Sequence, residues 1–468
     1  MAPRGDRRRA GVASALAGAF LSAGAWQPRE LGRLGKRALG DRRRWPLDLA
    51  EVVVRAYPEP PRDRPRELAT FIAHCEPFLG AWHGERPLHV RVWMAAPTRM
   101  GARRWPVPPI DDLAALATWL GVTPDHLAWF ADRRSMERTA PDERLRHHHR
   151  RWARTAGGGL RLIEAPKREL KDLQRQVLHH ILDRVPVHPA AHGFRPGRSA
   201  LTAAAAHAGR RVVLCLDLEA FFASVGVGRV HGIFRLAGYP EPVAHTLAAL
   251  CTTVTPLAAL RQAPAVPAGP GTGGGSPGGT PAGPGTGGVD GPVDRRRRLL
   301  QHLARPHLAQ GAPTSPALAN LSAFGLDRRL AGLARRLGGT YTRYADDLVL
   351  SSDVRLDLER VERAVHDIAR DEGFRLHRGK SRVAGAGRRQ TVLGLVVNER
   401  PNVARTEYDR LRAVLHHAAR AGPAAANREG HPDFRAHLLG RISWAGAANP
   451  ARAARLAGAF AAIDWPSG

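Results

Sequence analysis

The chain has 468 residues, 43% of them hydrophobic, and its 71 Lys and Arg against 42 Asp and Glu give a formal net charge of +29. This length and apolar content predict a globular protein with a substantial core, and the charge indicates a polyanionic partner, nucleic acid first and an anionic membrane second. No apolar run is long enough to span a bilayer, and Cys75, Cys215 and Cys251 are too scattered for a disulfide framework or a zinc site, which fits a reducing cytoplasm.

Residues 1–145 are predicted to form a helical extension. An arginine triplet at 7–9 and the Ala/Gly-rich stretch 10–26 imitate a secretory or twin-arginine signal, but an amphipathic helix is favoured. Further helices are predicted over 47–54 and 113–120, and another is capped near Thr123. The run 144–154 is rich in arginine, so its histidines are interpreted as part of a solvated basic segment rather than a metal site. They are His147, His148 and His149.

A strand, a helix and a basic loop are predicted next. Residues 161–166 form a short strand that ends at a proline, and 167–183 carry the apolar spacing of an amphipathic helix. The loop over 192–199 holds two glycines, which let backbone amides approach a phosphate, while Arg195 and Arg198 supply positive charge.

The continuous apolar run 212–216 predicts a fully buried strand. Asp217 stands at its end, where it is either the cap of the next helix or a metal ligand. The segment 264–292 is almost entirely Gly, Pro, Ala and Thr. It predicts a disordered insert over 262–294, within one domain rather than between two.

Two short strands, 341–344 and 348–351, flank Ala345-Asp346-Asp347 and predict a β-hairpin with adjacent carboxylates at its tip. Adjacent like charges are held together in a fold by a positive group, most plausibly Mg²⁺. The alternative is a solvated surface turn. Before this hairpin a Gly/Pro turn opens a helix over 317–333 that carries Asn320, and after it a helix is predicted over 356–369, a strand pair over 392–397 and basic helices beyond 405.

Nucleotidyl transfer uses two metal ions about 3.5–4 Å apart, held by carboxylates from separate strands. Asp217, Asp346 and Asp347 supply such carboxylates from a strand end and a hairpin.

Six blocks, in this order, resemble the motif series of bacterial reverse transcriptases. The blocks are Arg161-x-Ile163-x-x-Pro166, Gly193-Phe194-Arg195-Pro196-Gly197-Arg198-Ser199, Asp217-x-x-x-x-Phe222, Gln310-Gly311-x-x-x-Ser315-Pro316, Tyr344-Ala345-Asp346-Asp347 and Gly373-x-x-x-x-x-x-Lys380. The resemblance covers about residues 145–400. It is in particular to retron reverse transcriptases of the myxobacterial type, which carry a long N-terminal extension.

The resemblance implies an α+β, right-hand polymerase fold. Fingers and an antiparallel palm sheet would occupy 146–400, and a helical thumb 401–468. Two Mg²⁺ ions, or Mn²⁺, would be bound by Asp217, Asp346, Asp347 and the Leu218 carbonyl, with Lys380 as the acid for pyrophosphate.

The resemblance also implies contacts to nucleotide and nucleic acid. Phe222 would be a steric gate that excludes a ribose 2′-OH. The nucleotide site would further include Arg161, Gln310 and Gly311. The RNA template and primer would be contacted by Arg195, Arg198, Tyr344 and Arg405.

The implied activity is RNA-directed DNA polymerisation from dNTPs. A retron enzyme reverse-transcribes its own structured noncoding RNA into a short RNA-linked cDNA, primed from an internal guanosine 2′-OH, and serves in antiphage defence with a possible effector protein. The alternatives are another bacterial reverse transcriptase, group II intron-like or of another defence class, and a non-catalytic RNA-binding scaffold with a palm fold.

Overall fold

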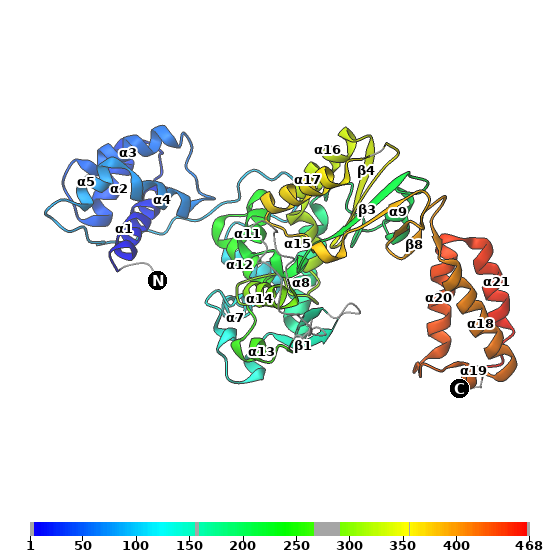
Figure 1. Cartoon of the computed structure of the whole chain (residues 1–468). Helices are drawn as coiled ribbons and strands as arrows, with labels where there is room; N and C mark the ends of the chain where they lie inside the picture. The colour runs from blue at the N-terminus through cyan, green and yellow to red at the C-terminus, as the bar shows by residue number, and fades with distance from the viewer. Residues whose placement is uncertain (1–3, 155–158, 266–290, 355, 466–468) are drawn as a thin grey trace, which may run out of the picture. The chain divides into compact units, whose positions relative to one another are not determined.

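The computed structural model describes residues 4–154, 159–265, 291–354 and 356–465 (Figure 1). The chain divides into two compact units: unit 1 comprises Met1–Pro186, Val225–Ala265 and Arg298–Leu318, and unit 2 comprises Val187–Ser224, Val266–Arg297 and Ala319–Gly468. Most of the insert predicted over 262–294 lies outside the described residues. Its last three residues differ from the prediction, because Pro292 begins a helix, α14 (Pro292–Leu303).

Five helices at the start of unit 1 pack around a common apolar core, in blue in Figure 1. They are α1 (Arg4–Leu21), α2 (Pro28–Leu39), α3 (Trp45–Ala56), α4 (Pro65–His74) and α5 (Glu76–Trp82). The helix predicted over 10–26 is confirmed as most of α1, and Leu16 and Phe20 on it are fully buried. Burying a side chain of this size stabilises the fold by about 1.5–3 kcal/mol.

The remainder of unit 1 contains several of the predicted elements and others that were not predicted. α6 (Leu113–Leu120) and α7 (Pro124–Ala131) are confirmed, the second with the Thr123 hydroxyl capping the amide of His126. Strand β1 (His148–Arg154) pairs antiparallel with β2 (Leu160–Pro166), which leads into α8 (Arg168–His180). The later helices are α11 (Val227–Leu236), α12 (Glu241–Leu250) and α13 (Leu257–Arg261), and 3-10 turns occur at Met136–Arg138, Glu143–Leu145 and Leu182–Arg184.

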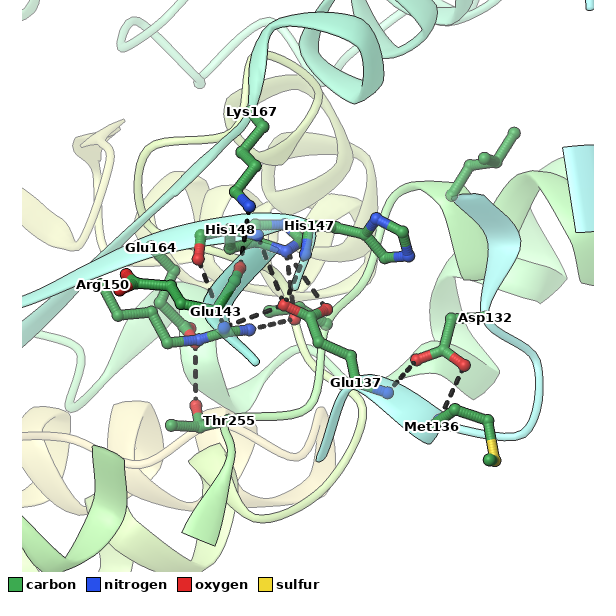
Figure 2. A network of polar contacts seen from close by, with 12 residues as sticks. Asp132, Met136, Glu137, Glu143, His147, His148, Arg150, Glu164, Lys167 and Thr255 are labelled. Atoms are coloured by element: carbon green, nitrogen blue, oxygen red, sulfur yellow. Dashed lines mark hydrogen bonds and ion pairs between the residues drawn. The ribbon is translucent and has the colours of Figure 1, made fainter. Parts of the chain in front are cut away.

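The prediction of a solvated basic segment at 144–154 is wrong. Residues 148–154 are strand β1, and the side chains of His147 and His148 are buried. The side chain of their charged neighbour Arg150 is only 7% exposed, and two acidic side chains reach it from elsewhere in unit 1 (Figure 2). The local sequence carries no sign of these partners, which lie 13 and 14 residues away.

The two acids are Glu137 and Glu164. Arg150 donates from Nη1 to Glu137 Oε1 and from Nε to Glu164 Oε1, both at 2.9 Å, and Thr255 and His307 also contact Glu164, at 2.9 and 2.7 Å. Burial alone would raise the pKa of Glu164, but the hydrogen bond from His307 and the charges of His307 and Arg150 lower it to about 2. The network therefore ties the β1–β2 pair to the segment that begins at His307.

A four-stranded antiparallel sheet forms the centre of unit 2, in the order β4-β5-β3-β6. Its strands are β3 (Val212–Asp217), β4 (Gly339–Tyr344), β5 (Asp347–Ser352) and β6 (Arg382–Gly385). The buried strand and the hairpin predicted from the sequence are thereby confirmed, as is the mixed α+β character. Adjoining helices are α9 (Ala200–Ala205), α10 (Phe221–Ser224) and α17 (Leu358–Asp371), with a 3-10 turn at Arg378–Lys380.

The single helix predicted over 317–333 is instead two helices, α15 (Ser315–Ser322) and α16 (Phe324–Arg336). The break falls at Ala323, whose ψ of 5° leaves the helical range. The apolar spacing continues across this position, so the sequence pattern does not mark the break.

Short strands and helices complete unit 2. The strand pair predicted over 392–397 is confirmed as β7 (Thr391–Val392) and β8 (Leu395–Val396), joined by β9 (Asn402–Val403). The helices predicted beyond 405 are α18 (Arg405–Ala421), α19 (Pro423–Ala426), α20 (Phe434–Ala448) and α21 (Pro450–Ala461), and they share a core that includes Leu415 and Leu438. In the described ranges no helix combines the length and apolarity needed to cross a membrane.

Candidate active site

The β4–β5 hairpin turns through two residues, Ala345 and Asp346, between the paired Tyr344 and Asp347. Ala345 has a φ of +55°, in the left-handed region that L-residues other than glycine, Asn and Asp rarely adopt. Such a conformation costs about 1–2 kcal/mol and persists only where surrounding contacts impose it. The conformation of the turn therefore depends on the residues that contact it.

The turn brings three carboxylate-bearing residues to one end of the sheet. Asp217 on β3 is the direct cross-strand partner of Asp347 on β5, and the amide of Leu218 donates to the carbonyl of Asp346 at 2.9 Å. Directly opposite residues in antiparallel strands have Cβ atoms about 5 Å apart, a spacing at which like charges repel.

The electrostatics of the site record this repulsion. Burial, followed by the charges of Asp346 and Asp217, raises the pKa of Asp347 from 3.8 to about 6, against the weaker opposing effect of Lys380 and Arg382. The sheet therefore holds a carboxylate that ionises about two pH units higher than an ordinary aspartate.

Lys380 supplies the nearest positive charge. Its Nζ lies 2.9 Å from Asp217 Oδ2, and the 3-10 turn that carries it is anchored because the amide of His377 donates to the carbonyl of Asp217 at 2.7 Å. The Lys380 side chain is half exposed whereas that of Asp217 is 13% exposed. The ammonium group thus lies on the solvent side of the carboxylate.

The donor set suits a hard divalent cation. Carboxylate oxygens are the ligands that Mg²⁺ prefers, and three carboxylate-bearing residues at one sheet end provide negative charge for it. In residues 4–154, 159–265, 291–354 and 356–465, no three His, Cys, Asp or Glu side chains are grouped so that they could hold a metal ion. Lys380 now occupies one oxygen of Asp217, so a bound cation would compete with this ammonium.

A buried arginine supports the turn from below. Arg343 on β4 is fully buried and pairs with Asp327 of α16 through two hydrogen bonds of 2.8 and 2.7 Å. Its Nη1 also donates to Asn320 Oδ1 at 3.0 Å and to the carbonyl of Ala345 at 3.1 Å. A bidentate pair with four of the five N–H donors of Arg343 engaged is an arrangement in which a buried charge is tolerated. It fixes the strained residue that precedes Asp346.

The loop predicted to approach phosphate lies against the same turn. The amide of His192 donates to the carbonyl of Arg343 at 2.7 Å, and Asn320 Nδ2 donates to the carbonyl of Gly193 at 2.9 Å. A Cβ on Gly193 would stand 2.7 Å from the amide nitrogen of Ala345. This glycine is needed for close backbone packing with the hairpin.

Aromatic rings connect this loop to the predicted nucleotide residue Phe222. The Phe194 ring lies 5.9 Å from that of Phe222 and 6.4 Å from that of Tyr344. Arg195 is half-buried and Arg198 is exposed on the same loop. Unit 2 thus brings together Phe222, Tyr344 and the loop that carries both arginines.

The other predicted site residues belong to other elements of the chain. Arg161, exposed on β2, belongs to unit 1, as do Gln310 and Gly311. The carbonyl of Gln310 accepts from the amide of Glu164 at 2.9 Å, and Gly311 has a φ of +130°. Arg405, at the start of α18, is exposed and pairs with Asp409 at 3.6 Å.

Sequence reasoning missed the polar residues beneath the turn. Arg343 and Asp327 are 16 residues apart and on different elements, so no spacing rule pairs them. The ring nitrogens of His207 contact Ser351 Oγ and Thr342 Oγ1 at 2.7 and 2.8 Å, and burial lowers its pKa to about 3. The available signal for Arg343 was that it is the single charged residue of the strand Gly339–Tyr344.

Comparisons with known proteins agree on one family. The family model for reverse transcriptase (RNA-dependent DNA polymerase) matches residues 298–397. The chain is 43% identical over 318 residues to the retron Mx65 reverse transcriptase of Myxococcus xanthus and 38% identical over 343 residues to the retron Mx162 reverse transcriptase of the same organism. It is 30% identical over 259 residues to the retron Ec86 reverse transcriptase of Escherichia coli. In that order, the three matches cover 68%, 69% and 55% of this chain. They cover 65%, 61% and 65% of the relatives, so the chain spans slightly less than two thirds of each relative's length.

Gly193→Ala is expected to destabilise unit 2 by about 1–3 kcal/mol, because the added methyl group forces the loop away from the Ala345 backbone. Gly332→Ala on α16 is the matched control, since no atom lies within 4 Å of its added Cβ. A helical Gly-to-Ala change of this kind stabilises by about 0.5–1 kcal/mol. Chemical denaturation measures both, and equal midpoints for Gly193→Ala and wild type would contradict the close packing.

Asp347→Asn is expected to stabilise the metal-free protein at pH 8. The folded-state pKa of about 6 exceeds the ordinary 3.8, so ionisation of Asp347 costs the folded state nothing well below pH 3.8, costs it more as the pH rises from 3.8 to 6, and reaches its full cost above pH 6. The gain from removing the charge is about 1–2 kcal/mol after allowance for partial exposure. Thermal unfolding in EDTA measures it. A lower midpoint for Asp347→Asn at pH 8, or a difference that grows as the pH falls, contradicts the assignment.

Proposed function

The chain is a relative of the retron reverse transcriptases, and on that relationship we propose that it is an RNA-directed DNA polymerase that copies a cognate structured noncoding RNA into short, RNA-linked cDNA. The observation that carries the proposal is the convergence of Asp217, Asp346 and Asp347 at one end of the sheet. A scaffold that only binds RNA has no need for three carboxylates whose mutual repulsion raises a pKa.

Within this proposal the sheet β4-β5-β3-β6 is the palm, and the helices from α18 onward form the thumb that grips an RNA/DNA duplex. Asp217, Asp346 and Asp347, with the Leu218 carbonyl, would hold two Mg²⁺ ions. Bound there, the ions would lower the pKa of the attacking hydroxyl and neutralise charge on the leaving pyrophosphate.

The chain's own groups would do the remaining work. Lys380, whose Nζ contacts Asp217 at 2.9 Å, would give a proton to the departing pyrophosphate. The Phe222 ring packs near Phe194, which would hold it rigid under the incoming sugar, so that a 2′-OH clashes with it. Arg161, Gln310 and Gly311 are proposed nucleotide contacts by resemblance, and Arg195, Arg198, Tyr344 and Arg405 are proposed contacts to template and primer.

The finer parts of the proposal rest on the retron relatives. They are priming from an internal guanosine 2′-OH, action in the cytoplasm, and a role in antiphage defence with an effector protein. The net charge of +29 supports an RNA partner, whose affinity would fall steeply with salt.

Asp346→Asn is expected to reduce primer extension on an RNA template with dNTPs and Mg²⁺ by at least about 10²-fold, because it removes a metal-binding charge. Asp353→Asn is the control, since Asp353 is an exposed aspartate just beyond β5 that pairs with Arg210. Extension by wild type and the control, and none in EDTA, supports the proposal. A wild-type protein that extends no primer, with Asp346→Asn indistinguishable from it, rejects the polymerase.

Expression together with the DNA that flanks the gene is expected to load the protein with cDNA joined to RNA. The nucleic acid extracted from the purified protein should be a conjugate of DNA and RNA. Ribonuclease treatment should shorten this conjugate, because it removes the attached RNA and leaves the DNA. The Asp346→Asn protein should carry none. Active polymerase whose extracted DNA is unchanged by ribonuclease would exclude the retron product while leaving the polymerase intact.

A further inference from the structure

Unit 1 contains a polar cavity of about 320 Å³ that the polymerase chemistry does not use. Glu137, His148 and Thr253 line it and are buried, whereas Arg66 and Arg133 line it and are exposed. A third exposed arginine, Arg138, also lines it. The cavity therefore has a buried polar floor and an arginine rim.

The rim carries positive charge without a counter-charge. In the described part of the chain, none of the three rim guanidinium groups has a carboxylate oxygen within 4 Å, whereas Arg150 beneath them has two. Burial and the charge of Arg66 lower the pKa of Arg133, which records the proximity of the two cations. His245, another lining residue, has a pKa lowered to about 4 by burial and then by His231, Arg66 and other cations.

The acids that line the cavity are already engaged by the chain (Figure 2). Glu137 accepts from Arg150 Nη1 and from the amide of His147, both at 2.9 Å. Asp132 accepts from the amides of Met136 and Glu137 at 2.7 and 2.9 Å. Neither carboxylate therefore serves as the partner of the arginine rim.

A buried ring nitrogen on the floor also lacks a partner. His148 is 3% exposed, its Nδ1 lies 3.5 Å from Glu137 Oε2, and its Nε2 has no hydrogen-bond partner among the described residues. A buried polar atom left in this state costs about 1–3 kcal/mol. A ligand oxygen in the cavity would remove that cost.

We propose that this cavity binds a phosphate monoester, carried by a nucleotide or by the end of a nucleic-acid strand. A monoester has up to two negative charges and three acceptor oxygens, which match the planar donors of several arginines and one imidazole. A diester within a strand has a single negative charge and two oxygens free to accept, so it matches several arginines and an imidazole less well. The site goes beyond the polymerase function and does not depend on it.

The test is equilibrium binding of one labelled oligonucleotide in three forms, with a 5′-phosphate, a 3′-phosphate or no terminal phosphate, in the absence of dNTPs. The wild-type protein is expected to bind one phosphorylated form at least about tenfold more tightly than the unphosphorylated form, a difference of 1.4 kcal/mol. The combined Arg66→Gln and Arg133→Gln variant should lose this preference. Arg134→Gln, which removes the same charge from an exposed neighbour outside the cavity lining, should retain it.

Competition identifies the source of the phosphate. Adenosine monophosphate that displaces the phosphorylated oligonucleotide indicates a nucleotide site, and failure to displace it indicates a strand-end site. Equal binding of all three forms by wild type, with no displacement by the nucleotide, overturns the proposal, as does a preference that survives in the double variant. Because binding is measured without polymerisation, these outcomes are independent of whether primer extension succeeds.

Discussion

The organisation of unit 2 follows from one electrostatic constraint: like charges must be held close together. Asp217 and Asp347 are cross-strand partners, and Asp346 occupies the turn beside them. Repulsion at this spacing works against folding, so the surrounding sheet has to hold the strands in register independently of the acids. Apolar residues along β3 and β5 do so by burial, and His207 adds a neutral bridge between β4 and β5.

Beneath the turn, two opposite charges are paired, in contrast to the like charges of the aspartates. Arg343 and Asp327 neutralise one another inside the protein. Nη1 of the guanidinium group donates to Asn320 and to the carbonyl of Ala345. A hydrophobic pair of similar volume often provides as much stability as a buried ion pair. It provides no donor for the Ala345 carbonyl, so the polar pair gives this turn a directional support that apolar packing lacks.

Periodicity and turn chemistry were enough to predict β3, the hairpin and the helices near 113–131, because each of these elements is specified by adjacent residues. The errors have a common cause. From the local sequence Arg150 and His148 are expected to be solvated, because Glu137 and Glu164 belong to other elements. The break at Ala323 interrupts no apolar pattern. The chemistry of nucleotidyl transfer and the resemblance both grouped the three aspartates, while the raised pKa of Asp347 and the contacts of Arg343 required coordinates.

The alternation of the chain between the two units has a consequence for synthesis. Unit 1 is completed only by residues 298–318, and the partner that His307 provides for Glu164 lies 143 residues further along the chain. A ribosome adds about 5–20 residues per second, so the nascent chain spends several seconds with this carboxylate lacking its imidazole. A chain that ends before residue 298 therefore lacks the residues that complete unit 1, whereas the core of its first five helices lies wholly within residues 12–88.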